Sequence, residues 1–353
     1  MTKHTQEHAS RHKRKGARSL ALALALDAVL AGVLVGGDYF YSYKLPHKLH
    51  AAQITTQTAA QPNASASDAS QVVTAAADWH EKFKDQFSDT VISSDTTYKS
   101  PDISITITTA SYDTGTVDRS ENGKHVKYGT KIAYTLADIY IGDISCLQTG
   151  FAQDTYGVGY SERLSDMSAR MQAALAVNGD SYSNNHHKDN GTIIRNGIVY
   201  RAQPSTEETC VLYRDGTMKT YTPDEFDAQQ VIADGAWQSW VFGPSLLDEN
   251  GRAKTDFLTW DYIRESHPRT AIGYYEPGHY CLLLVDGRQP DYSRGMFLEE
   301  MAQLFEALGC KAAYNLDGGH CSFMVKDGAV VSQPYKPTKD VSDGILICER
   351  KEG

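Results

Sequence analysis

Apolar and polar residues alternate in short runs from residue 101 onward, a pattern that is typical of half-buried β-strands. Residues 103–108 alternate strictly, and residues 131–141 do so less cleanly. An Asn-Gly pair inside residues 193–200 and an Asp-Gly pair between residues 210 and 221 predict two β-hairpins. Further strands are expected at residues 240–244, 245–247, 270–274 and 280–286.

Helical spacing of apolar residues is rarer. It predicts helices over residues 167–176 and 296–308 and a shorter one over residues 78–87. Strands outnumber helices, and the helices separate groups of strands. The sequence therefore predicts an α+β domain with a mixed or antiparallel sheet and a few packed helices.

The N-terminal segment predicts a membrane anchor. Residues 20–37 are mainly Ala, Leu and Val, and Asp27 is the only charged residue among them. This length is near the lower limit for crossing a bilayer. Residues 1–18 contain six Lys or Arg and one Glu, and the positive-inside rule places such a segment in the cytoplasm. We expect a cytoplasmic tail over residues 1–18 and one transmembrane helix over residues 19–38.

Residues 39–77 are expected to form a flexible linker, because most of them are small or polar. The folded domain is then expected over residues 78–353, outside the cell. The formal net charge of the chain is -10 despite its basic tail, and 41% of its residues are hydrophobic. Such an acidic domain argues against nucleic acid as a partner, and its apolar content is sufficient for a core.

Six cysteines are spread widely and form no C-x-x-C metal pattern. Cys281 and Cys348 lie in apolar runs and are expected to be buried strand residues. Cys310 and Cys321 would be able to pair if the segment between them were a hairpin, because an extracellular location permits disulfides.

Four polar clusters follow or precede predicted strands, at residues 178–182, 268–270, 286–288 and 315–319. Each combines a charged residue with Gly or Pro. If the clusters converge in one cleft, it contains the carboxylates of Asp180, Asp286 and Asp317. Glycosidic cleavage uses one protonated acid and one carboxylate as base or nucleophile. Arg269 would offer two parallel donors to a phosphate.

Three of the clusters also have a purely structural interpretation. Asp317 and Gly318 would form an ordinary hairpin turn between apolar runs at residues 308–316 and 321–325. Asp286 would be a turn residue, and Arg269 would form an ion pair that holds the domain together. A metal site at His186, His187 and Asp189 is a further alternative, although the spacing fits no standard pattern.

Six stretches in a fixed order resemble the phosphodiester glycosidase family. They are residues 176–182, 242–246, 267–273, 284–288, 295–302 and 308–319. The resemblance covers about residues 140–349 and implies hydrolysis of the bond between an anomeric sugar carbon and a phosphodiester. It also implies a site lined by Asn178, Asp180, Arg269, Asp286, Arg288, Asp317, Gly318 and Gly319.

The sequence departs from the family pattern after Gly319. The family usually reads Asp-Gly-Gly-Gly-Ser-Ser, whereas this chain has His320-Cys321-Ser322 in place of the last three residues. A side chain at position 320 would narrow the cleft or supply a titratable group. We count His320, Ser322 and Thr270 among the candidate substrate-binding residues.

Together these features predict a membrane-anchored extracellular glycoside hydrolase that cleaves sugar-1-phosphodiester bonds in envelope or exopolysaccharide glycans. Asp317 and Asp180 are the expected acid and base or nucleophile, in either order, and Asp286 is a third catalytic candidate. Arg269 and Arg288 would hold the phosphate. No cofactor is expected, although a divalent cation is compatible with the sequence. A non-catalytic glycan-binding or assembly module and a metal-dependent phosphodiesterase are the alternatives.

Overall fold

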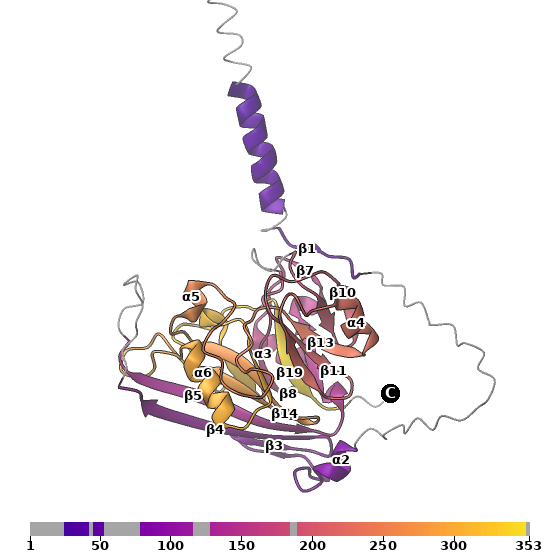
Figure 1. Ribbon diagram of the computed structural model, residues 1–353, viewed down its shortest axis with the longest axis vertical. Coiled ribbons are helices and arrows are strands. Elements are labelled where there is room, and N and C mark those ends of the chain that lie inside the picture. Colours follow the sequence, from indigo (N-terminus) through magenta and orange to yellow (C-terminus); the bar gives the residue numbers. More distant parts are fainter. Residues whose placement is uncertain (1–24, 42–44, 53–77, 116–127, 184–188, 351–353) are drawn as a thin grey trace, which may run out of the picture. The chain divides into compact units, whose positions relative to one another are not determined.

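The computed structural model describes residues 25–41, 45–52, 78–115, 128–183 and 189–350 (Figure 1). The chain divides into two compact units, Met1–His47 and Lys48–Gly353. In the first unit, residues 25–41 form a helix with exposed side chains. None of the helices that the structure describes is long and apolar enough to cross a membrane. The expected tail and the first residues of the expected anchor lie outside the described residues, as does most of the expected linker.

Antiparallel sheets form most of the second unit. The larger sheet has seven strands in the order β16 (Ala312–Asn315), β14 (Arg269–Glu276), β15 (His279–Val285), β5 (Lys131–Ile141), β4 (Ile103–Asp113), β3 (Thr97–Lys99) and β2 (Ile92–Ser93). The second sheet has five strands in the order β18 (Ala329–Val330), β17 (Met324–Lys326), β8 (Ala173–Asn178), β19 (Asp343–Cys348) and β6 (Leu147–Phe151). Every strand pair within these two sheets is antiparallel.

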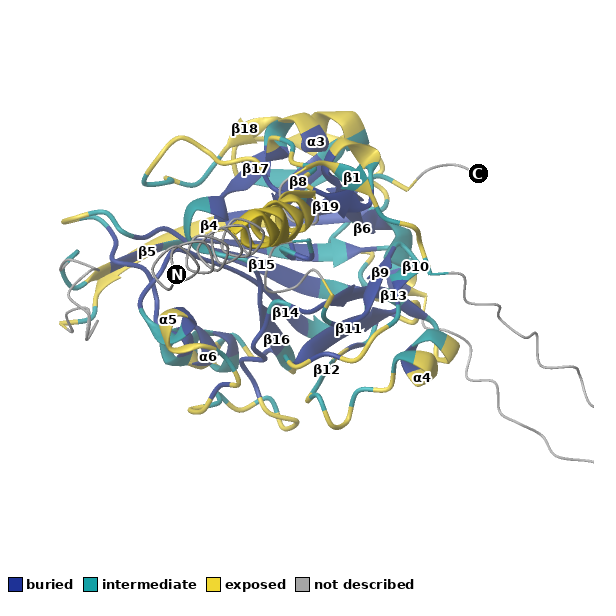
Figure 2. Ribbon diagram, turned by 90° about the horizontal axis from the view of Figure 1, so that it is seen from above, coloured by how far each residue is buried: buried dark blue, intermediate teal, exposed yellow. Residues whose placement is uncertain are grey.

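The alternation of side chains along each strand builds the layers of this unit. In β15, Leu282 and Leu284 belong to the core between the two sheets, whereas Cys281 and Leu283 face a second core on the opposite side. In β19, Ile345 likewise belongs to the core between the sheets. Central strands such as β15 and β19 are therefore buried on two faces and appear dark blue in Figure 2, whereas the edge strands β2 and β18 are exposed.

Two helices cover the outer faces. α6 (Leu298–Ala307) buries Leu298, Met301 and Phe305 against the larger sheet, and α3 (Leu164–Met171) buries Leu164 and Met167 against the second sheet. Each fully buried apolar side chain of this size contributes about 1.5–3 kcal/mol. The predicted α+β class and the predicted helix over residues 296–308 are confirmed.

The predicted helix over residues 167–176 is wrong in its second half. Helix α3 ends where Gln172 adopts a left-handed conformation at φ 55°. Residues from Ala173 onward form β8, which lies between β17 and β19 in the middle of the second sheet. The run of small apolar residues therefore reflects burial on both faces of a central strand, which overrides its helical propensity.

The smaller elements follow local turn chemistry. Both predicted hairpins are confirmed, as β9 (Ile193–Arg195) with β10 (Ile198–Arg201) and β11 (Thr209–Tyr213) with β12 (Met218–Tyr221). The strand expected at residues 240–244 instead ends at Trp240, as β13 (Ala236–Trp240), which pairs with β11. Residues 245–247 make only isolated bridges. The remaining elements are β1 (His47–Lys48), β7 (Gly157–Val158), α2 (Trp79–Lys82), α4 (Ala228–Ala233), α5 (Asp261–Arg264), η1 (Ile144–Cys146), η2 (Ala152–Asp154) and η3 (Gly319–Cys321).

The Asp-Gly-Gly segment is not a hairpin. Strand β16, which precedes Asp317, belongs to the larger sheet, and β17, which follows η3, belongs to the second sheet. Residues 316–323 therefore cross from one sheet to the other, which corrects the turn interpretation. The carboxylate of Asp317 lies where the two sheets meet.

All six cysteines are buried free thiols. The Sγ atom of Cys310 lies 3.9 Å from that of Cys281. Cys310 and Cys321 do not form a disulfide, because β16 and β17 belong to different sheets and do not form the hairpin that would bring the two thiols together.

Candidate functional site

The ends of strands from both sheets meet at one place. In the larger sheet, Arg269 at the start of β14 pairs with Val285 at the end of β15, and β16 ends beside β14 at Asn315. In the second sheet, the end of β8 pairs with the start of β17. Because the strands are rigid, the residues just beyond them are held in a fixed relation to one another.

A pair of buried hydrogen bonds connects the two sheets at this place. Thr270 Oγ1 donates to Asn178 Oδ1 at 2.6 Å, and Asn178 Nδ2 donates to the main-chain oxygen of Asp317 at 2.6 Å. Both Asn178 and Thr270 are buried. These two predicted site residues therefore lie behind Asp317 and fix its backbone.

A cavity of about 140 Å³ opens at this junction. Six of its lining residues are ones that the sequence predicted, namely Arg269, Arg288, Asp317, Gly318, Gly319 and His320. Four others were not singled out as site residues, namely Phe242, Tyr262, Ile263 and His267. Phe242 and His267 lie in the stretches that resemble the family, so position within a motif was the available signal for them. Tyr262 and Ile263 lie on α5, outside every motif.

Arg269 is a buried cation in the wall of this cavity. Its side chain is 2% exposed, and its guanidinium donates to the main-chain oxygens of Met296, Ile263 and Glu265. Burial, and then the charge of Arg288, lower the pKa of Arg269 to about 9, so it remains charged at neutral pH. No carboxylate among the described residues forms an ion pair with it, so the ion-pair interpretation does not apply there.

Arg288 is the second cation of the cavity. Its guanidinium donates to the hydroxyls of Tyr335 and Tyr262, both at 2.9 Å, and to Nδ1 of His267 at 3.1 Å. Its Nε is buried without a hydrogen-bond partner. No ion pair with a carboxylate is formed by Arg288 within the described part of the chain. Two guanidinium groups therefore face one small cavity without a compensating ion pair, which favours binding of an anion.

Asp317 is the one carboxylate among the described residues that line this cavity. Burial raises its pKa, whereas hydrogen bonds from the Gly318 N–H, Ser181 and Cys321 act in the opposite direction. The Gly318 N–H donates to Asp317 Oδ1 at 2.8 Å. A carboxyl with a raised pKa is suited to exchange protons during a reaction near neutral pH.

The two glycines allow close packing of the backbone in the cavity wall. A Cβ atom on Gly318 would lie 2.9 Å from the main-chain oxygen of Pro268. Gly319 has φ +69°, and a Cβ atom there would lie 3.4 Å from the guanidinium nitrogens of Arg288. A side chain at either position would therefore displace the groups that form the cavity.

His320 stands where the family usually has glycine. Its Nε2 lies 2.7 Å from the main-chain oxygen of Pro337, and its ring lies 5.6 Å from that of Tyr335. The imidazole therefore occupies space along the wall of the cavity. Ser322, in contrast, is buried, does not line this cavity, and its Oγ has no hydrogen-bond partner.

The structure does not bring Asp180 into this cavity. Asp180 is fully buried, and its Oδ2 accepts from Val241 N at 2.8 Å and lies 3.4 Å from Arg195 Nη2. The same Nη2 donates to Asp343 Oδ2 at 2.8 Å, and Asp343 Oδ1 accepts from the N–H of Asp180. Burial and the charge of Asp180 raise the pKa of Asp343, against the lowering effect of Arg195. Asp180 is thus part of a buried charge cluster that the sequence did not predict.

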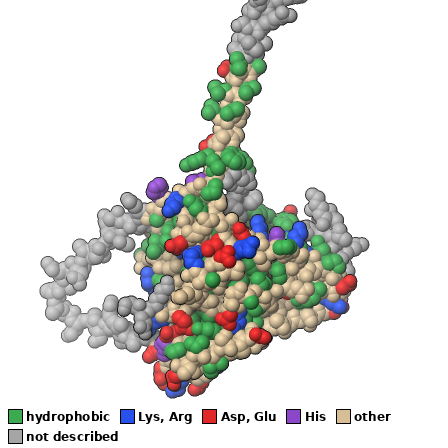
Figure 3. All heavy atoms as spheres, turned by 180° about the vertical axis from the view of Figure 1, so that it is seen from behind, with side chains coloured by type: hydrophobic (Ala, Val, Ile, Leu, Met, Phe, Trp, Pro, Cys, Tyr) green, Lys and Arg blue, Asp and Glu red, His purple; other side chains and the backbone are tan. Residues whose placement is uncertain are grey.

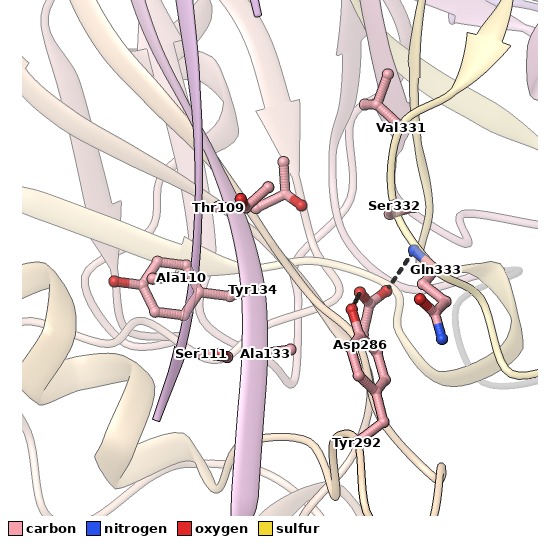
Figure 4. A pocket seen from close by; sticks show the side chains of 11 residues that line it. Thr109, Ala110, Ser111, Ala133, Tyr134, Asp286, Tyr292, Val331, Ser332 and Gln333 are labelled. Atoms are coloured by element: carbon pink, nitrogen blue, oxygen red, sulfur yellow. Dashed lines mark hydrogen bonds between the residues drawn. The ribbon is translucent and has the colours of Figure 1, made fainter. Parts of the chain in front are cut away.

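Asp286 lies in a different cavity, which has a volume of about 390 Å³ (Figure 4). Its Oδ2 accepts from the Tyr292 hydroxyl at 2.9 Å, and its Oδ1 accepts from Gln333 N at 3.0 Å. Burial raises the pKa of Asp286 from 3.8 to about 6, and the two hydrogen bonds oppose this shift. The three predicted carboxylates are therefore found in three separate environments.

The raised pKa of Asp286 predicts a pH dependence of stability. Because the folded pKa of about 6 lies above the unfolded value of 3.8, the folded state binds the proton more tightly. The resulting contribution of Asp286 to the free energy of unfolding is complete below the unfolded pKa and is lost as the pH rises through the folded pKa. This contribution amounts to about 3 kcal/mol. When urea unfolding is measured between about pH 4 and pH 7, the free energy of unfolding should decline less steeply with rising pH for Asp286→Asn than for the original chain. The control variant Asp224→Asn, at an exposed position, should keep the original slope of unfolding free energy against pH. The same slope in Asp286→Asn would contradict the raised pKa of Asp286.

No group of three or more His, Cys, Asp or Glu side chains in the described ranges is placed to hold a metal ion. His186 and His187, which the sequence offered as metal ligands, lie outside the described residues. On the face shown in Figure 3, acidic and basic side chains of the second unit are interspersed.

Comparisons with known proteins agree with the sequence stretches noted above. The model of a family described as phosphodiester glycosidase matches residues 171–348. The SPbeta prophage-derived uncharacterized protein YomE of Bacillus subtilis (strain 168) is 32% identical over 194 residues, which are 54% of this chain and 29% of that protein. The chain thus spans less than a third of the length of this relative.

One solved structure with low sequence identity has the same fold. The catalytic domain of zebrafish N-acetylglucosamine-1-phosphodiester alpha-N-acetylglucosaminidase, auto-inhibited by its pro-peptide, matches with a TM-score of 0.52 and 20% identity. The match covers 69% of this chain and 84% of that one. A hypothetical protein from Synechocystis matches with a TM-score of 0.49 and 14% identity over 70% of this chain and 62% of that one.

Proposed function

Because the chain belongs to the phosphodiester glycosidase family, we propose that it hydrolyses the bond between an anomeric sugar carbon and a phosphodiester. The observation that carries this proposal is the presence of two guanidinium groups and one carboxyl in the lining of the same cavity, beside the start of β14. Its 140 Å³ is below the roughly 300–1,000 Å³ of a typical small-molecule site. The cavity therefore suits the phosphate group and leaves the remainder of the substrate outside it.

The cavity would act on the bond in the following way. When the bond between C1 and the phosphate oxygen breaks, its electron pair moves to that oxygen. Arg269 and Arg288 would stabilise the charge that develops there, because hydrogen bonds to the protein already hold their guanidinium groups in place. Water supplies the oxygen for C1 and a proton for the released phosphate. Asp317 would transfer that proton, as acid toward the leaving oxygen or as base toward the water.

This role differs from the paired catalytic carboxylates that the sequence suggested. Asp180 contacts Arg195 and Val241 rather than the cavity, so we assign it to positioning the end of β8. A phosphate is a better leaving group than a sugar alcohol, because its negative charge is delocalised over several oxygens. A site that stabilises this charge therefore depends less on a second carboxylic acid to protonate the leaving oxygen than the site of an ordinary glycosidase does.

Hydrolysis in heavy-oxygen water tests the proposal. The full chain would be incubated with methyl diesters of several sugar 1-phosphates, beginning with N-acetylglucosamine. Label in the sugar is expected, since the proposed attack is at carbon. Label in the phosphate would instead indicate attack at phosphorus, as in a phosphodiesterase, and binding of all diesters without turnover would indicate a glycan-binding module.

Loss of Arg288 should weaken the interaction with the phosphate. Arg288→Met removes one charge-assisted contact, worth about 1.5–3 kcal/mol, so kcat/KM should fall by roughly 10- to 100-fold. Arg214 stacks on Trp237, 4.8 Å from the ring centroid, and lines neither cavity described here. Arg214→Met is therefore the matched control and should leave kcat/KM unchanged. Equal values for the two variants would argue against phosphate binding by Arg288.

The proposed site of action is an envelope or exopolysaccharide glycan outside the membrane. The charge asymmetry of residues 1–18 and the apolar run that follows support this location. Alkaline phosphatase fused after residue 353 in a bacterial host should be active, since this reporter folds only outside the cytoplasm. An inactive, stably expressed fusion would contradict the proposed topology.

A further inference from the structure

Cys281 and Cys310 place two sulfur atoms side by side where helix α6 packs on the larger sheet. Their Sγ atoms are 3.9 Å apart, and both side chains are buried. They belong to the core on the outer face of this sheet, together with Phe305 of α6. Neither thiol lines the cavity that contains Arg269 and Arg288, so the proposed reaction gives this pair no role.

The backbone that carries each thiol is held by hydrogen bonds. Cys281 lies in the middle of β15, where it pairs with Gly273 of β14 on one side and with β5 on the other. Cys310 follows the end of α6, where Gly309 adopts φ +81° and the N–H of Cys310 donates to the main-chain oxygen of Phe305 at 3.1 Å. This bond and the glycine belong to a Schellman motif, which fixes the chain just beyond a helix end. The fold itself therefore keeps the two sulfur atoms together.

A disulfide bond is within reach of these two side chains. Its S–S bond is about 2 Å long, so the sulfur atoms must approach each other by about 2 Å. A change of rotamer at one cysteine moves its sulfur atom by about 3 Å and leaves the backbone in place. Gly273 keeps the space beside Cys281 open, because a Cβ atom there would lie 2.7 Å from Cys281 Sγ. The observed separation is therefore compatible with a bond formed by side-chain rotation alone.

From this geometry we propose that Cys281 and Cys310 are an oxidisable pair that forms a disulfide between β15 and the end of α6. The oxidant is a small disulfide such as oxidised glutathione. The thiolate of one cysteine attacks it, forms a mixed disulfide and releases one glutathione thiol. The second cysteine then displaces the remaining glutathione, so that two protein thiols become one disulfide and the oxidant becomes two thiols.

Burial determines when this bond forms. It raises the pKa of the Cys281 thiol well above its usual value, and the neighbouring Cys310 adds to this effect. Because the thiolate is the species that attacks a disulfide, the folded chain should be oxidised slowly. Both thiols are open to solvent in the unfolded chain, so the bond should form as the domain folds. Disulfides persist outside the cytoplasm, which is the location proposed for this domain.

The disulfide would close a loop over residues 281–310. This loop contains Arg288 and the main-chain oxygen of Met296 that accepts from Arg269. Linking the ends of such a loop restricts the unfolded chain and thereby stabilises the folded state. For a unit of this size the melting temperature should rise by roughly 5–10 °C.

Counting free thiols tests this proposal without requiring turnover. The full chain would be refolded from urea with reduced and oxidised glutathione, or with dithiothreitol alone, and a further sample would be oxidised without unfolding. N-ethylmaleimide would then be added in urea, where buried thiols react, and mass spectrometry would count the labels. Cys281→Ala removes one member of the pair. Cys210→Ala is the matched control, because Cys210 is also a fully buried cysteine on a strand.

Because the chain has six cysteines, the reduced chain should carry six labels and the oxidised chain four. After oxidation, Cys281→Ala should carry five labels and Cys210→Ala three, and digestion should give a peptide in which Cys281 is joined to Cys310. The oxidised original chain should melt roughly 5–10 °C above its reduced form, a difference that Cys281→Ala should lose. Six labels in both oxidised samples overturn the proposal. A disulfide between other cysteines, or a glutathione that stays attached to Cys281 or Cys310, also overturns it.

Discussion

Replacing Asp317 by Asn is expected to lower kcat by about 100- to 10,000-fold, the range for loss of a general acid or base. The amide has nearly the same shape as the carboxyl, and its oxygen can still accept from the N–H of Gly318, which bonds Asp317 Oδ1 at 2.8 Å. The variant should therefore fold and bind substrate, and the loss should appear in kcat rather than in KM. Steady-state hydrolysis of a sugar 1-phosphate methyl diester measures both constants.

The matched control is Asp224→Asn, because Asp224 is an exposed carboxylate that lines neither cavity described here. It removes the same formal charge and should retain the original kcat. Turnover by Asp317→Asn at the rate of Asp224→Asn would exclude Asp317 from proton transfer and would leave the proposed chemistry without its carboxyl.

Replacing Arg195 by Met should produce the largest loss of stability. Arg195, Asp180 and Asp343 are each at most 1% exposed, and the guanidinium lies between the two carboxylates. Without it, two neighbouring buried carboxyls lose their counter-ion, which costs about 3–5 kcal/mol. For a unit of this size the melting temperature should fall by roughly 10 °C. Calorimetry or circular dichroism would measure this change.

Arg252→Met is the control for this loss. Arg252 is 75% exposed and forms a surface ion pair with Glu306 at 2.9 Å, a class of interaction worth about 0–1 kcal/mol. Replacing all three members of the buried cluster, as Asp180→Asn, Arg195→Met and Asp343→Asn together, should recover part of the stability lost in Arg195→Met. If Arg195→Met melts no lower than Arg252→Met, the buried cluster is not an important source of stability.

The local sequence pattern was sufficient to predict strands and turns where neighbouring residues decide the backbone conformation. The alternation over residues 131–141 predicted β5 with its observed bounds, and the Asn-Gly pair placed the turn between β9 and β10. Both features depend on contacts between strands or on backbone dihedral angles close to the residues concerned. The motif stretches also contain Arg269, Arg288 and residues 317–319, all of which line the cavity beside the start of β14.

Local pattern was insufficient where distant segments determine the environment. Asp180, Asp286 and Asp317 each follow a strand and stand beside glycine, so nothing nearby distinguishes them. In the folded protein, Arg195 lies beside Asp180. A Tyr hydroxyl and a main-chain N–H donate hydrogen bonds to Asp286, and two arginines line the same cavity as Asp317. A charged Arg at the end of an apolar strand was the available hint of the buried cluster.

The sequence by itself determined an α+β domain with a mixed or antiparallel sheet, its hairpins, the helix α6 and the residues that carry the family motifs, because these depend on periodicity, turn chemistry and residue identity. The tertiary structure alone decided that the chain crosses between two sheets at Asp317 and that the polar strand ends separate into an arginine cavity, a carboxylate cavity and a buried ion cluster. The physical reason is that the charge, burial and pKa of a side chain are set by the groups packed around it. Those groups come from strands that are far apart in the chain and meet only when the two sheets pack together.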